Sequence, residues 1–423
     1  MKKKILAFDS WTGGVIHYAR LMPELRKKHI ELMLVHIGSW GSDMGRPKEE
    51  SLQGILVRDV CFYDNPDFEN ILKTEKPDLV LFLSTQTFAH RAFIRFCKKL
   101  KIPTVHLTHG IFSSMALESG RFYKMNLLSY GKFILSRVVK MFKKVWPTYL
   151  GALLRTSGGN KDFLNFIRDN INLLLSRDAP LADDGITDQV LIYTAADLDY
   201  AISNFRSPHT NIKIVGNPDA SRFGLTEELI NLFSKEQFQK NKDVVYIDTS
   251  LILRGAIFQD FEQYRAHLME TNQAFRDLGR RMFVKLHPNF DGTGIPQRLR
   301  AVGLEICPHE RFLEHLRNSC CALTEASTAG LMPAYMGLPV FLAQYGRLKE
   351  HQFGSIFSTY PRAVFLRDLP ELKNYFCDDS ELKKIFNKDI SKWVDFNLGP
   401  RPLDAMPRRC VEAFVSLMKE RIS

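Results

Sequence analysis

The sequence lacks the cysteine patterns that mark zinc sites and disulfide-rich domains. The 423 residues include seven cysteines. None of these forms a CxxC pair, and the sequence has no paired histidines. Zinc sites and disulfide frameworks both depend on such spacings, so we expect no metal site and no disulfides. Scattered cysteines of this kind are typical of a reducing compartment, which indicates a cytoplasmic protein.

Long apolar runs are also missing. No stretch of 18 apolar residues occurs, so the sequence predicts no transmembrane helix. The first ten residues, MKKKILAFDS, have a basic start but an apolar run of only four, which predicts a first strand and not a signal peptide. There is no internal repeat and no low-complexity segment.

The overall amino-acid composition is that of a globular protein with excess positive charge. Hydrophobic residues make up 45% of the chain and charged residues 25%, which excludes a disordered protein, and the length suits two domains. The net charge of +11 indicates an acidic partner: nucleic acid, an anionic membrane or an anionic substrate. No RNA- or DNA-binding module is recognisable, so we expect no nucleic-acid partner.

The first part of the chain alternates strand and helix patterns. Near-continuous apolar strands are predicted at 4–9, 30–38, 54–62, 78–84, 104–110, 190–195 and 212–218. Apolar strands separated by helices are typical of a parallel sheet covered on both faces. We therefore predict an N-terminal Rossmann-like domain over residues 1–218.

The rest of the chain predicts a second domain of the same class. Residues 111–189 interrupt the first alternation and are expected to form a basic helical insertion, and the polar segment 219–243 is the expected linker. A new set of apolar strands predicts a Rossmann-like domain over 244–400, followed by a C-terminal helix over 401–423. The predicted fold class is α/β, with two Rossmann-like domains facing each other across a cleft.

Two apolar runs of the second domain end in hydrogen-bonding residues. The run MFVKLHP ends at His287, where Pro288 stops the strand because it has no N–H to donate. Ligands of open α/β sheets lie beyond the carboxyl ends of the strands, so His287 is placed to donate to a phosphate. Lys285 is a further donor-binding candidate, although alternation along the strand predicts that its side chain points to the other face.

The run ALTEASTAGL ends near Glu325 and leads into a predicted helix that Ser327 and Thr328 open. Their hydroxyls and the N–H groups of the first turn suit an anion, and an ordinary N-cap is the alternative. Glu325 is expected to bind ribose or base hydroxyls, because a carboxylate repels phosphate. Ser250, which ends the strand VVYIDTS, is a candidate phosphate contact. With His287, these residues predict a nucleotide mono- or diphosphate site.

The second domain resembles that of bacterial GT-B transferases that build surface polysaccharides. These include capsule Kdo transferases, sialyl- and polysialyltransferases and CDP-glycerol glycerophosphotransferases. Their shared features are a His-Pro motif after a strand and a Ser-Ser or Ser-Thr pair that opens a later helix. The matching residues here are His287-Pro288 and Ser327-Thr328. The resemblance implies a nucleotide-sugar donor bound by the second domain.

Candidates for a catalytic base lie at strand ends of the first domain. The run TVHLTHG contains His109, and the glycerophosphotransferases resemble it with a His-Gly at the matching place that serves as their base. Histidine suits this task because its ordinary pKa of about 6.5 lies near working pH. Asp9 is the alternative, since sialyltransferases of this fold use an acidic residue in the first domain, but it would also suit a helix cap. Gly13 and Gly14 follow Asp9 and let the backbone approach a ligand closely.

The insertion has the composition of a membrane-binding segment. No Asp or Glu occurs from Gly120 to Lys161, and within 121–155 basic residues are interleaved with apolar and aromatic ones. Such a helix can lie in a membrane interface, where each cationic side chain contributes on the order of 1 kcal/mol near an anionic surface. A helix packed on the sheet with a solvated basic rim is the alternative. We predict peripheral contact with the inner face of an anionic membrane through 121–155.

Together these features predict an inverting, metal-independent glycosyltransferase. The resemblance implies, as the favoured donor, a CMP-linked acidic sugar (Kdo or a sialic-type sugar) and, as the acceptor, a surface polysaccharide or a lipid-linked glycan. Asp197-Leu198-Asp199 matches the DxD of metal-dependent transferases, but it lies at a predicted helix start, where acidic charge is favourable. We therefore expect no metal and no cofactor. The alternatives are a CDP-glycerol-type polyol-phosphate transferase or a UDP-sugar 2-epimerase on the same fold, and a non-catalytic membrane-docked partner in a glycan assembly complex.

Overall fold

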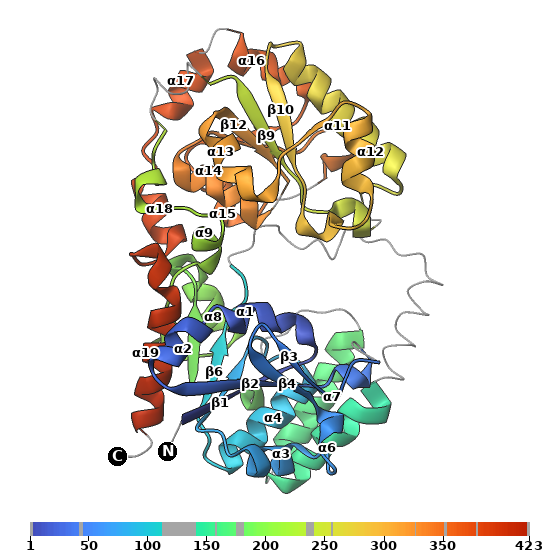
Figure 1. Cartoon of the computed structure of the whole chain (residues 1–423), viewed down its shortest axis with the longest axis vertical. Helices are drawn as coiled ribbons and strands as arrows, with labels where there is room; N and C mark the ends of the chain where they lie inside the picture. Colours follow the sequence, from blue (N-terminus) through green and yellow to red (C-terminus); the bar gives the residue numbers. More distant parts are fainter. Residues whose placement is uncertain are drawn as a thin grey trace. The chain divides into compact units, whose positions relative to one another are not determined.

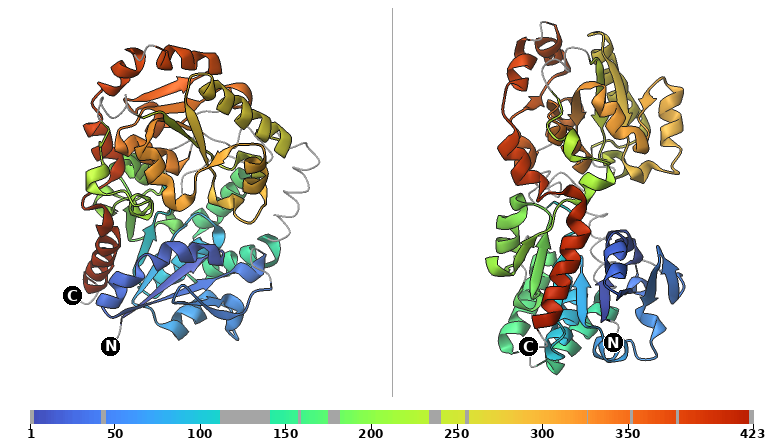
Figure 2. Two further views of the ribbon diagram at one scale, coloured as in Figure 1. Left: turned by 45° about the horizontal axis from the view of Figure 1, so that its top comes forward. Right: turned by 60° about the vertical axis from the view of Figure 1, so that its left-hand side comes forward.

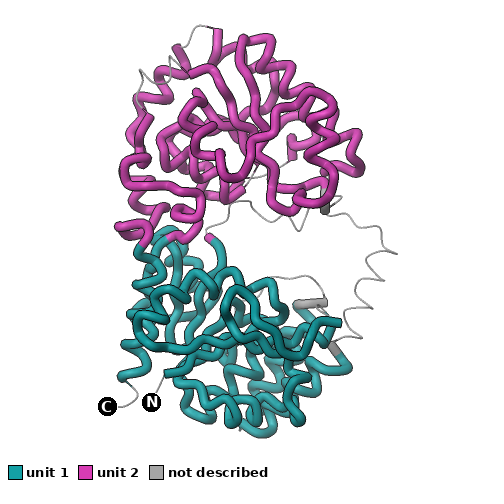
Figure 3. The backbone as a smooth tube through the Cα atoms, in the orientation of Figure 1, with its two compact units in different colours: residues 1–110, 125–216, 405–423 teal, residues 111–124, 217–404 magenta. Residues whose placement is uncertain are grey.

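A computed structural model describes most of the chain. The described residues are 3–41, 45–111, 141–156, 159–174, 182–233, 241–254, 257–325, 327–350, 353–377 and 380–420. They form two compact units (Figure 3). The first unit is built from the described parts of 1–110, 125–216 and 405–423, and the second from those of 111–124 and 217–404.

The first unit contains an eight-stranded sheet (Figure 1). The order across it is β3 (Glu49–Leu52), β4 (Ile55–Asp59), β2 (Ile30–His36), β1 (Lys3–Asp9), β5 (Leu79–Phe82), β6 (Thr104–Leu107), β7 (Gln189–Ile192) and β8 (Ile212–Ile214). Neighbouring strands are parallel except β3 and β4, which form an antiparallel pair. The parallel strands follow the predicted apolar runs. Strand β3 was not predicted, because its residues, EESL, are mostly polar.

Helices of the first unit cover this sheet. They are α1 (Val15–Ala19), α2 (Met22–Lys27), α3 (Phe68–Glu75), α4 (Phe88–Lys99), α6 (Trp146–Arg155), α7 (Asn160–Leu174), α8 (Leu198–Asn204) and α19 (Met406–Glu420). Apolar side chains of β1, β2 and β5 form one core with those of α3, α4 and α6. Within it the ring of Phe8 stacks on Phe93 with centroids 4.2 Å apart. Helix α19 contacts α2 (Figure 2).

Buried ion pairs attach the helical insertion to α4. The Arg91 guanidinium donates to Asp184 and Asp169 at 2.7 Å each and to the Tyr149 hydroxyl at 2.8 Å. Arg95 donates to Asp162 of α7 at 2.7 Å. The insertion predicted over 111–189 is therefore helical at 146–155 and 160–174. The part of the basic segment 121–155 that precedes residue 141 lies outside the described residues.

The second unit contains a six-stranded parallel sheet. Its order is β11 (Glu305–Ile306), β10 (Arg281–Lys285), β9 (Asp243–Ile247), β12 (Ser319–Thr324), β13 (Val340–Ala343) and β14 (Ala363–Leu366). The helices are α9 (Pro218–Arg222), α11 (Phe261–Arg276), α12 (Ile295–Ala301), α13 (Phe312–Arg317), α14 (Leu331–Met336), α15 (Ser355–Ser358), α16 (Leu372–Phe376), α17 (Ser380–Phe386) and α18 (Ser391–Leu398). The predicted α/β class with two Rossmann-like domains is confirmed.

The unit boundaries differ from the predicted domain boundaries both around the expected linker and near the C-terminal helix. Residues 219–233, expected in a linker, contain part of α9 and belong to the second unit. The C-terminal segment, expected to be helical from 401, forms α19 from Met406 and belongs to the first unit. Both differences arise because tertiary contacts, which the sequence pattern does not contain, decide which unit a segment joins.

In the described part of the chain, no helix combines the length and the apolar character needed to cross a membrane.

Candidate functional site

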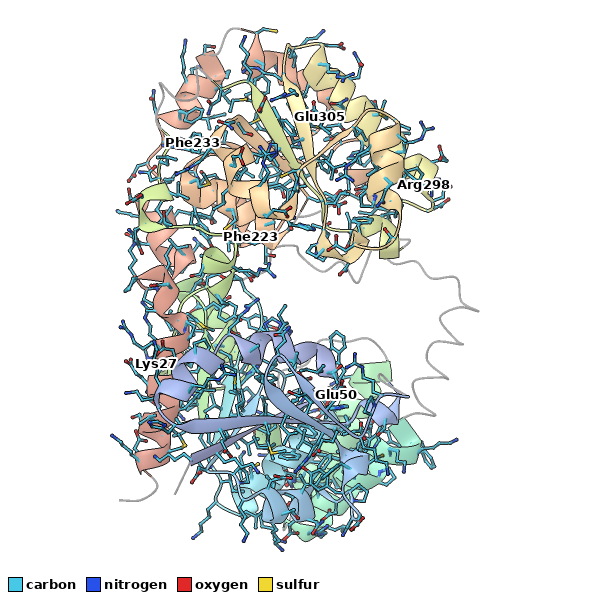
Figure 4. All side chains as sticks on the ribbon, in the orientation of Figure 1. Lys27, Glu50, Phe223, Phe233, Arg298 and Glu305 are labelled. Atoms are coloured by element: carbon cyan, nitrogen blue, oxygen red, sulfur yellow. The ribbon has the colours of Figure 1, made fainter. Side chains whose placement is uncertain are left out.

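A cavity of about 540 Å³ lies within the second unit, beyond the carboxyl ends of four neighbouring strands. Lys285 is the last residue of β10 and His287 follows it, while Asp248 follows β9. Ser327 follows β12, and His309 follows β11. Arg222 and Phe223, which is labelled in Figure 4, line the same cavity. This is where a ligand of an open parallel sheet is expected.

The structure brings the two predicted motifs together in this cavity. His287 and Pro288 line it with Ser327 and Thr328. The Ser327 side chain makes no capping hydrogen bond to the short helix that follows, although Ser327 occupies the N-cap position. Its hydroxyl therefore lines the cavity without the ordinary capping role that was the alternative interpretation.

The orientation of His287 is fixed by its own turn. Its Nδ1 accepts a hydrogen bond from the Asn289 backbone N–H at 3.2 Å. In the neutral ring the proton is then carried by Nε2, which makes that nitrogen a donor. The His287 backbone N–H donates to Asp248 at 3.4 Å, so the residue is held from both sides. A donor in this position is suited to an anionic oxygen.

Lys285 lines the cavity, so the expectation that it points to the other face was wrong. It is the last residue of β10, and its long side chain bends to donate to the carbonyl of Leu286 at 2.9 Å. Its Nζ also donates to Nδ1 of His309 at 2.5 Å. Burial of the ammonium group lowers the pKa of Lys285 to about 8. Lys285 can thus change charge within the pH range in which many enzymes work.

His309 is a site residue that the sequence analysis missed. Its Nε2 lies 3.5 Å from Asp291, on the side opposite to Lys285. Because Nδ1 accepts from Lys285, the proton of the neutral ring is on Nε2, toward this carboxylate. The signal in the sequence was the histidine that directly follows the apolar run LEICP, three residues after the end of strand β11.

Glu325 does not line this cavity, and its predicted role in binding ribose or base hydroxyls has no geometric support. Its side chain is fully buried. Its carboxylate accepts hydrogen bonds from the Tyr246 hydroxyl at 2.8 Å and from the Thr249 backbone N–H at 2.9 Å. Burial raises the pKa of Glu325. The carboxylate therefore fixes the loop after β9 from inside the unit.

Asp248 acts on the same loop. One of its oxygens accepts from the Tyr264 hydroxyl at 2.9 Å and the other from the Ser250 backbone N–H at 2.7 Å. Burial, and then the nearby Glu325 carboxylate, raise the pKa of Asp248 well above its ordinary value. Ser250 is buried, with a φ of 61° in the left-handed region, and does not line the cavity. It shapes the loop that Asp248 holds.

A second cavity, of about 280 Å³, lies within the first unit at the carboxyl ends of β1, β5 and β6. Both predicted bases, Asp9 and His109, line it. Gly13 and Gly14 line it as well, and the remaining lining residues are Ser10, Trp11, His17, Leu83 and Ser84. The structure therefore brings together the four first-domain residues that were singled out from separate stretches of sequence.

His109 is oriented for proton acceptance. Its Nδ1 lies 2.9 Å from the carbonyl oxygen of Leu83. A carbonyl only accepts, so Nδ1 carries the proton of the neutral ring and the lone pair lies on Nε2. The ring of His17 packs edge-on with centroids 6.0 Å apart. A histidine with a fixed tautomer is thereby placed at the cavity.

Asp9 is an almost buried carboxylate that packs against a glycine. It is 6% exposed, and burial raises its pKa to about 6. A Cβ atom at Gly14 would lie 2.2 Å from its Oδ2, so no larger residue fits there without moving the carboxylate. Asp9 is not the N-cap residue of either helix after the loop, since Trp11 and Gly14 occupy those positions. A Cβ atom at Gly13 would lie within 2.6 Å of three ring atoms of Trp11.

The DxD tripeptide lies away from both cavities. Asp197 is buried and accepts a hydrogen bond from Thr194 at 3.2 Å, and Asp199 lies in the first turn of α8. Across the described residues, no group of three or more His, Cys, Asp or Glu side chains is arranged to hold a metal ion.

Comparison with solved structures identifies the fold. A histidine-to-alanine variant of the wall teichoic acid polymerase TagF matches 100% of this chain and 90% of its own, with 12% identity and a TM-score of 0.51. The Staphylococcus aureus MnaA–UDP structure matches 99% and 98% of the two chains, with 14% identity and a TM-score of 0.48. The Neisseria meningitidis UDP-GlcNAc 2-epimerase matches 98% and 100%, with 15% identity and a TM-score of 0.46.

The chain has a fold of the GT-B type. No protein-family model matches its sequence, and no curated protein matches it either. The fold type therefore rests on the structural comparison. This comparison supports the GT-B fold but does not single out Kdo or sialyl transferases.

In this GT-B chain, Asp9→Asn should remove a pH dependence of stability. In this pH range the folded wild-type chain keeps a proton on Asp9 that the unfolded chain releases. The free energy of unfolding of the wild type therefore falls as pH rises from about 4 through 6. Raising this pKa from 3.8 to about 6 corresponds to a loss of roughly 3 kcal/mol in the free energy of unfolding at high pH. Chemical unfolding at pH 4 and pH 7.5 should show the variant gaining about 2–3 kcal/mol relative to wild type between the two.

The matched control is Asp64→Asn, which changes an exposed carboxylate of the same unit. Its unfolding free energy relative to wild type should stay constant over the same range. An Asp9→Asn variant that is no more stable than wild type at pH 7.5 would show that the buried carboxylate carries no such cost.

Anion binding in the larger cavity should weaken as pH rises, because Lys285 loses its proton near pH 8. With CMP as the probe, whose phosphate ionises below pH 7, affinity should fall by up to about tenfold between pH 7 and pH 9. Lys285→Arg keeps the charge, so its affinity should be independent of pH over this range. Isothermal titration calorimetry measures both profiles, and parallel profiles for the two proteins would contradict the assignment.

Proposed function

We propose that the chain is an inverting, metal-independent glycosyltransferase that binds the nucleotide of its donor in the cavity of the second unit. The observation that supports this most strongly is the convergence of Lys285, His287, Ser327 and Thr328 on one cavity at the carboxyl ends of neighbouring parallel strands. Three of these side chains donate hydrogen bonds in their neutral forms, and the fourth carries positive charge when protonated. Such a set suits phosphate oxygens.

The cavity would stabilise the leaving nucleotide. In the reaction we propose, the bond between the anomeric carbon and the donor phosphate breaks, and the phosphate keeps the electron pair. The developing negative charge would be met by the ammonium of Lys285, the Nε2–H of His287 and the hydroxyl of Ser327. Fixed donors of this kind lower the barrier because they need no reorganisation during the reaction.

The first unit would supply the base. The acceptor hydroxyl loses its proton to Nε2 of His109 as its oxygen forms the new bond to the anomeric carbon, which inverts the configuration there. We favour His109 over Asp9 because the hydrogen bond to Leu83 fixes its tautomer. Asp9, with a pKa of about 6, is ionised at neutral pH and remains the second candidate.

A cytidine nucleotide is the donor class we favour, with a CMP-linked acidic sugar such as Kdo or a sialic-type sugar as the substrate. The carboxylate of such a sugar would suit a cavity that also contains Arg222 and His309. The acceptor would be a surface polysaccharide or lipid-linked glycan. The chain would work in the cytoplasm at the inner face of the membrane, with peripheral contact through 121–155.

A CDP-glycerol-type polyol-phosphate transferase is the second candidate. It is favoured by the similarity to TagF, a wall teichoic acid polymerase, of which one solved histidine variant was soaked with CDPG. This reaction would release the same nucleotide, CMP, but the acceptor oxygen would attack phosphorus instead of carbon. A UDP-sugar 2-epimerase would differ from both because it converts its nucleotide sugar with no acceptor present.

Nucleotide binding should be selective and should depend on the cavity. A thermal-shift screen against CMP, CDP, UDP and GDP is expected to raise the unfolding temperature with the cytidine nucleotides, because a ligand bound only by the folded state stabilises it. His287→Ala and Ser327→Ala should each reduce the CMP shift, with affinity lowered by about tenfold or more for a lost hydrogen bond to a charged group. His315→Ala is the control, since it removes a histidine of the same unit that does not line the cavity.

A uridine-selective shift would redirect the proposal to the epimerase, and no shift with any nucleotide would favour a non-catalytic partner. Unchanged CMP binding in both His287→Ala and Ser327→Ala would overturn the site assignment.

The base can be tested separately from nucleotide binding. His109→Gln should leave the CMP thermal shift intact and should lower the rate of acceptor-dependent CMP release by about 100-fold or more, the usual contribution of a general base. Asp9→Asn should cause the smaller loss if His109 is the base. Retention of the wild-type rate by His109→Gln, together with its loss in Asp9→Asn, would transfer the role to Asp9.

A further inference from the structure

Helix α7 presents large apolar side chains to solvent along one side. Phe163, Leu164, Ile167 and Ile171 are 50%, 65%, 42% and 49% exposed. With 3.6 residues per turn, these four positions fall within an arc of about 100° around the helix axis. We call this set the α7 stripe. An ordinary surface helix turns its apolar stripe toward the core, so the arrangement here is the reverse of the usual one.

The opposite side of α7 attaches the helix to its unit without using the stripe. Asp162 and Asp169 bind Arg95 and Arg91 of α4 at 2.7 Å each. The ring of Phe166 stacks on Tyr149 with centroids 5.4 Å apart. The α7 stripe is therefore not part of the packing that holds the helix in place, and exposed apolar area of this kind marks an interaction surface.

An aromatic series connects the α7 stripe to a second exposed residue. The ring of Phe163 lies 6.3 Å from Phe166, which lies 6.0 Å from Trp146. Trp146 in turn lies 5.7 Å from Phe142, which is 66% exposed. Figure 1 shows α6 and α7 together in the first unit. Phe142 and the α7 stripe thus belong to one continuous apolar region.

The charges around this region are mostly cationic. Residues 141–174 contain five Lys or Arg and two Asp, and both Asp are the ones bound to α4. Lys143 and Lys144 follow Phe142 and are exposed. The Lys161 and Arg168 side chains are 82% and 56% exposed. Arg168 pairs with its neighbour Asp169, and Lys161 forms a surface ion pair with Asp183. Surface pairs of this type are weak and leave the cations able to meet another anion.

We propose that the α7 stripe, with Phe142, Lys143 and Lys144, is the surface through which the chain binds an anionic lipid bilayer. An apolar face bordered by Lys and Arg lies in the headgroup region with its apolar side chains inserted. A second copy fits less well, because two such cationic surfaces repel each other. The inference extends the membrane contact proposed for 121–155 to α7 at 160–174, and it does not depend on the proposed transferase activity.

The test uses the full chain and vesicles of phosphatidylglycerol and phosphatidylcholine in equal amounts, with co-sedimentation as the measurement. The double variant Phe163→Ser/Ile167→Ser should bind these vesicles about tenfold or more weakly, because two apolar side chains no longer enter the bilayer. The matched control is Phe396→Ser/Ile202→Ser, which changes one Phe and one Ile that are 54% and 40% exposed elsewhere. The control should bind within about twofold of wild type, since it leaves the surface intact.

The contribution of charge is tested with the double variant Lys143→Gln/Lys144→Gln, which should bind the anionic vesicles about tenfold more weakly. Binding of the wild type should also weaken with added salt. The melting temperature and the circular dichroism spectrum of each variant show that it is folded. Equal vesicle binding by the two serine double variants would overturn the proposal. It would also be overturned if the chain self-associates in sedimentation velocity without lipid and Phe163→Ser/Ile167→Ser abolishes that association.

Discussion

The hydrogen bonds accepted by Asp248 and Glu325 are the constraint on which the larger cavity depends. Both carboxylates are buried at the carboxyl ends of neighbouring strands β9 and β12. Burying a carboxylate costs several kcal/mol unless hydrogen bonds replace its water, and here tyrosine hydroxyls and backbone N–H groups do so. One Asp248 oxygen accepts from both Ser250 and His287. The position of His287 is thus tied to the loop after a different strand.

Much of the fold and part of the site could be predicted because apolar runs mark buried parallel strands and ligands bind beyond their ends. That argument located Asp9, His109, His287 and Ser327 at strand ends. It missed His309, because strand β11 ends three residues before it and Cys307 and Pro308 separate the histidine from the strand end. It also gave Glu325 a binding role, since the sequence does not show whether a polar side chain at a strand end points to the ligand or to the interior.

Asp9, at the smaller cavity, has a pKa that burial raises, as it does those of Asp248 and Glu325. Its carboxylate is nearly as buried as that of Asp248, but the hydrogen bond it accepts from the Ser10 backbone N–H only partly offsets the loss of water. The result is a raised pKa and a cost to the folded state at neutral pH. Groups held at such a cost gather at functional sites, because selection for stability alone would remove them. Gly14 keeps the space that this carboxylate occupies.

The same reasoning separates the two sides of α7. Its buried side is attached through ion pairs, which on average contribute little net stability because both partners lose water. A helix selected only for packing would bury Phe163, Leu164, Ile167 and Ile171 instead, since each buried apolar side chain of this size contributes about 1.5–3 kcal/mol. Instead these four side chains are exposed to water, and Asp162 and Asp169 attach the helix to α4. Exposed apolar side chains are expected on this helix if they contact a partner outside the folded unit. Hydrophobic periodicity cannot predict their exposure, because it assigns every apolar stripe to the core.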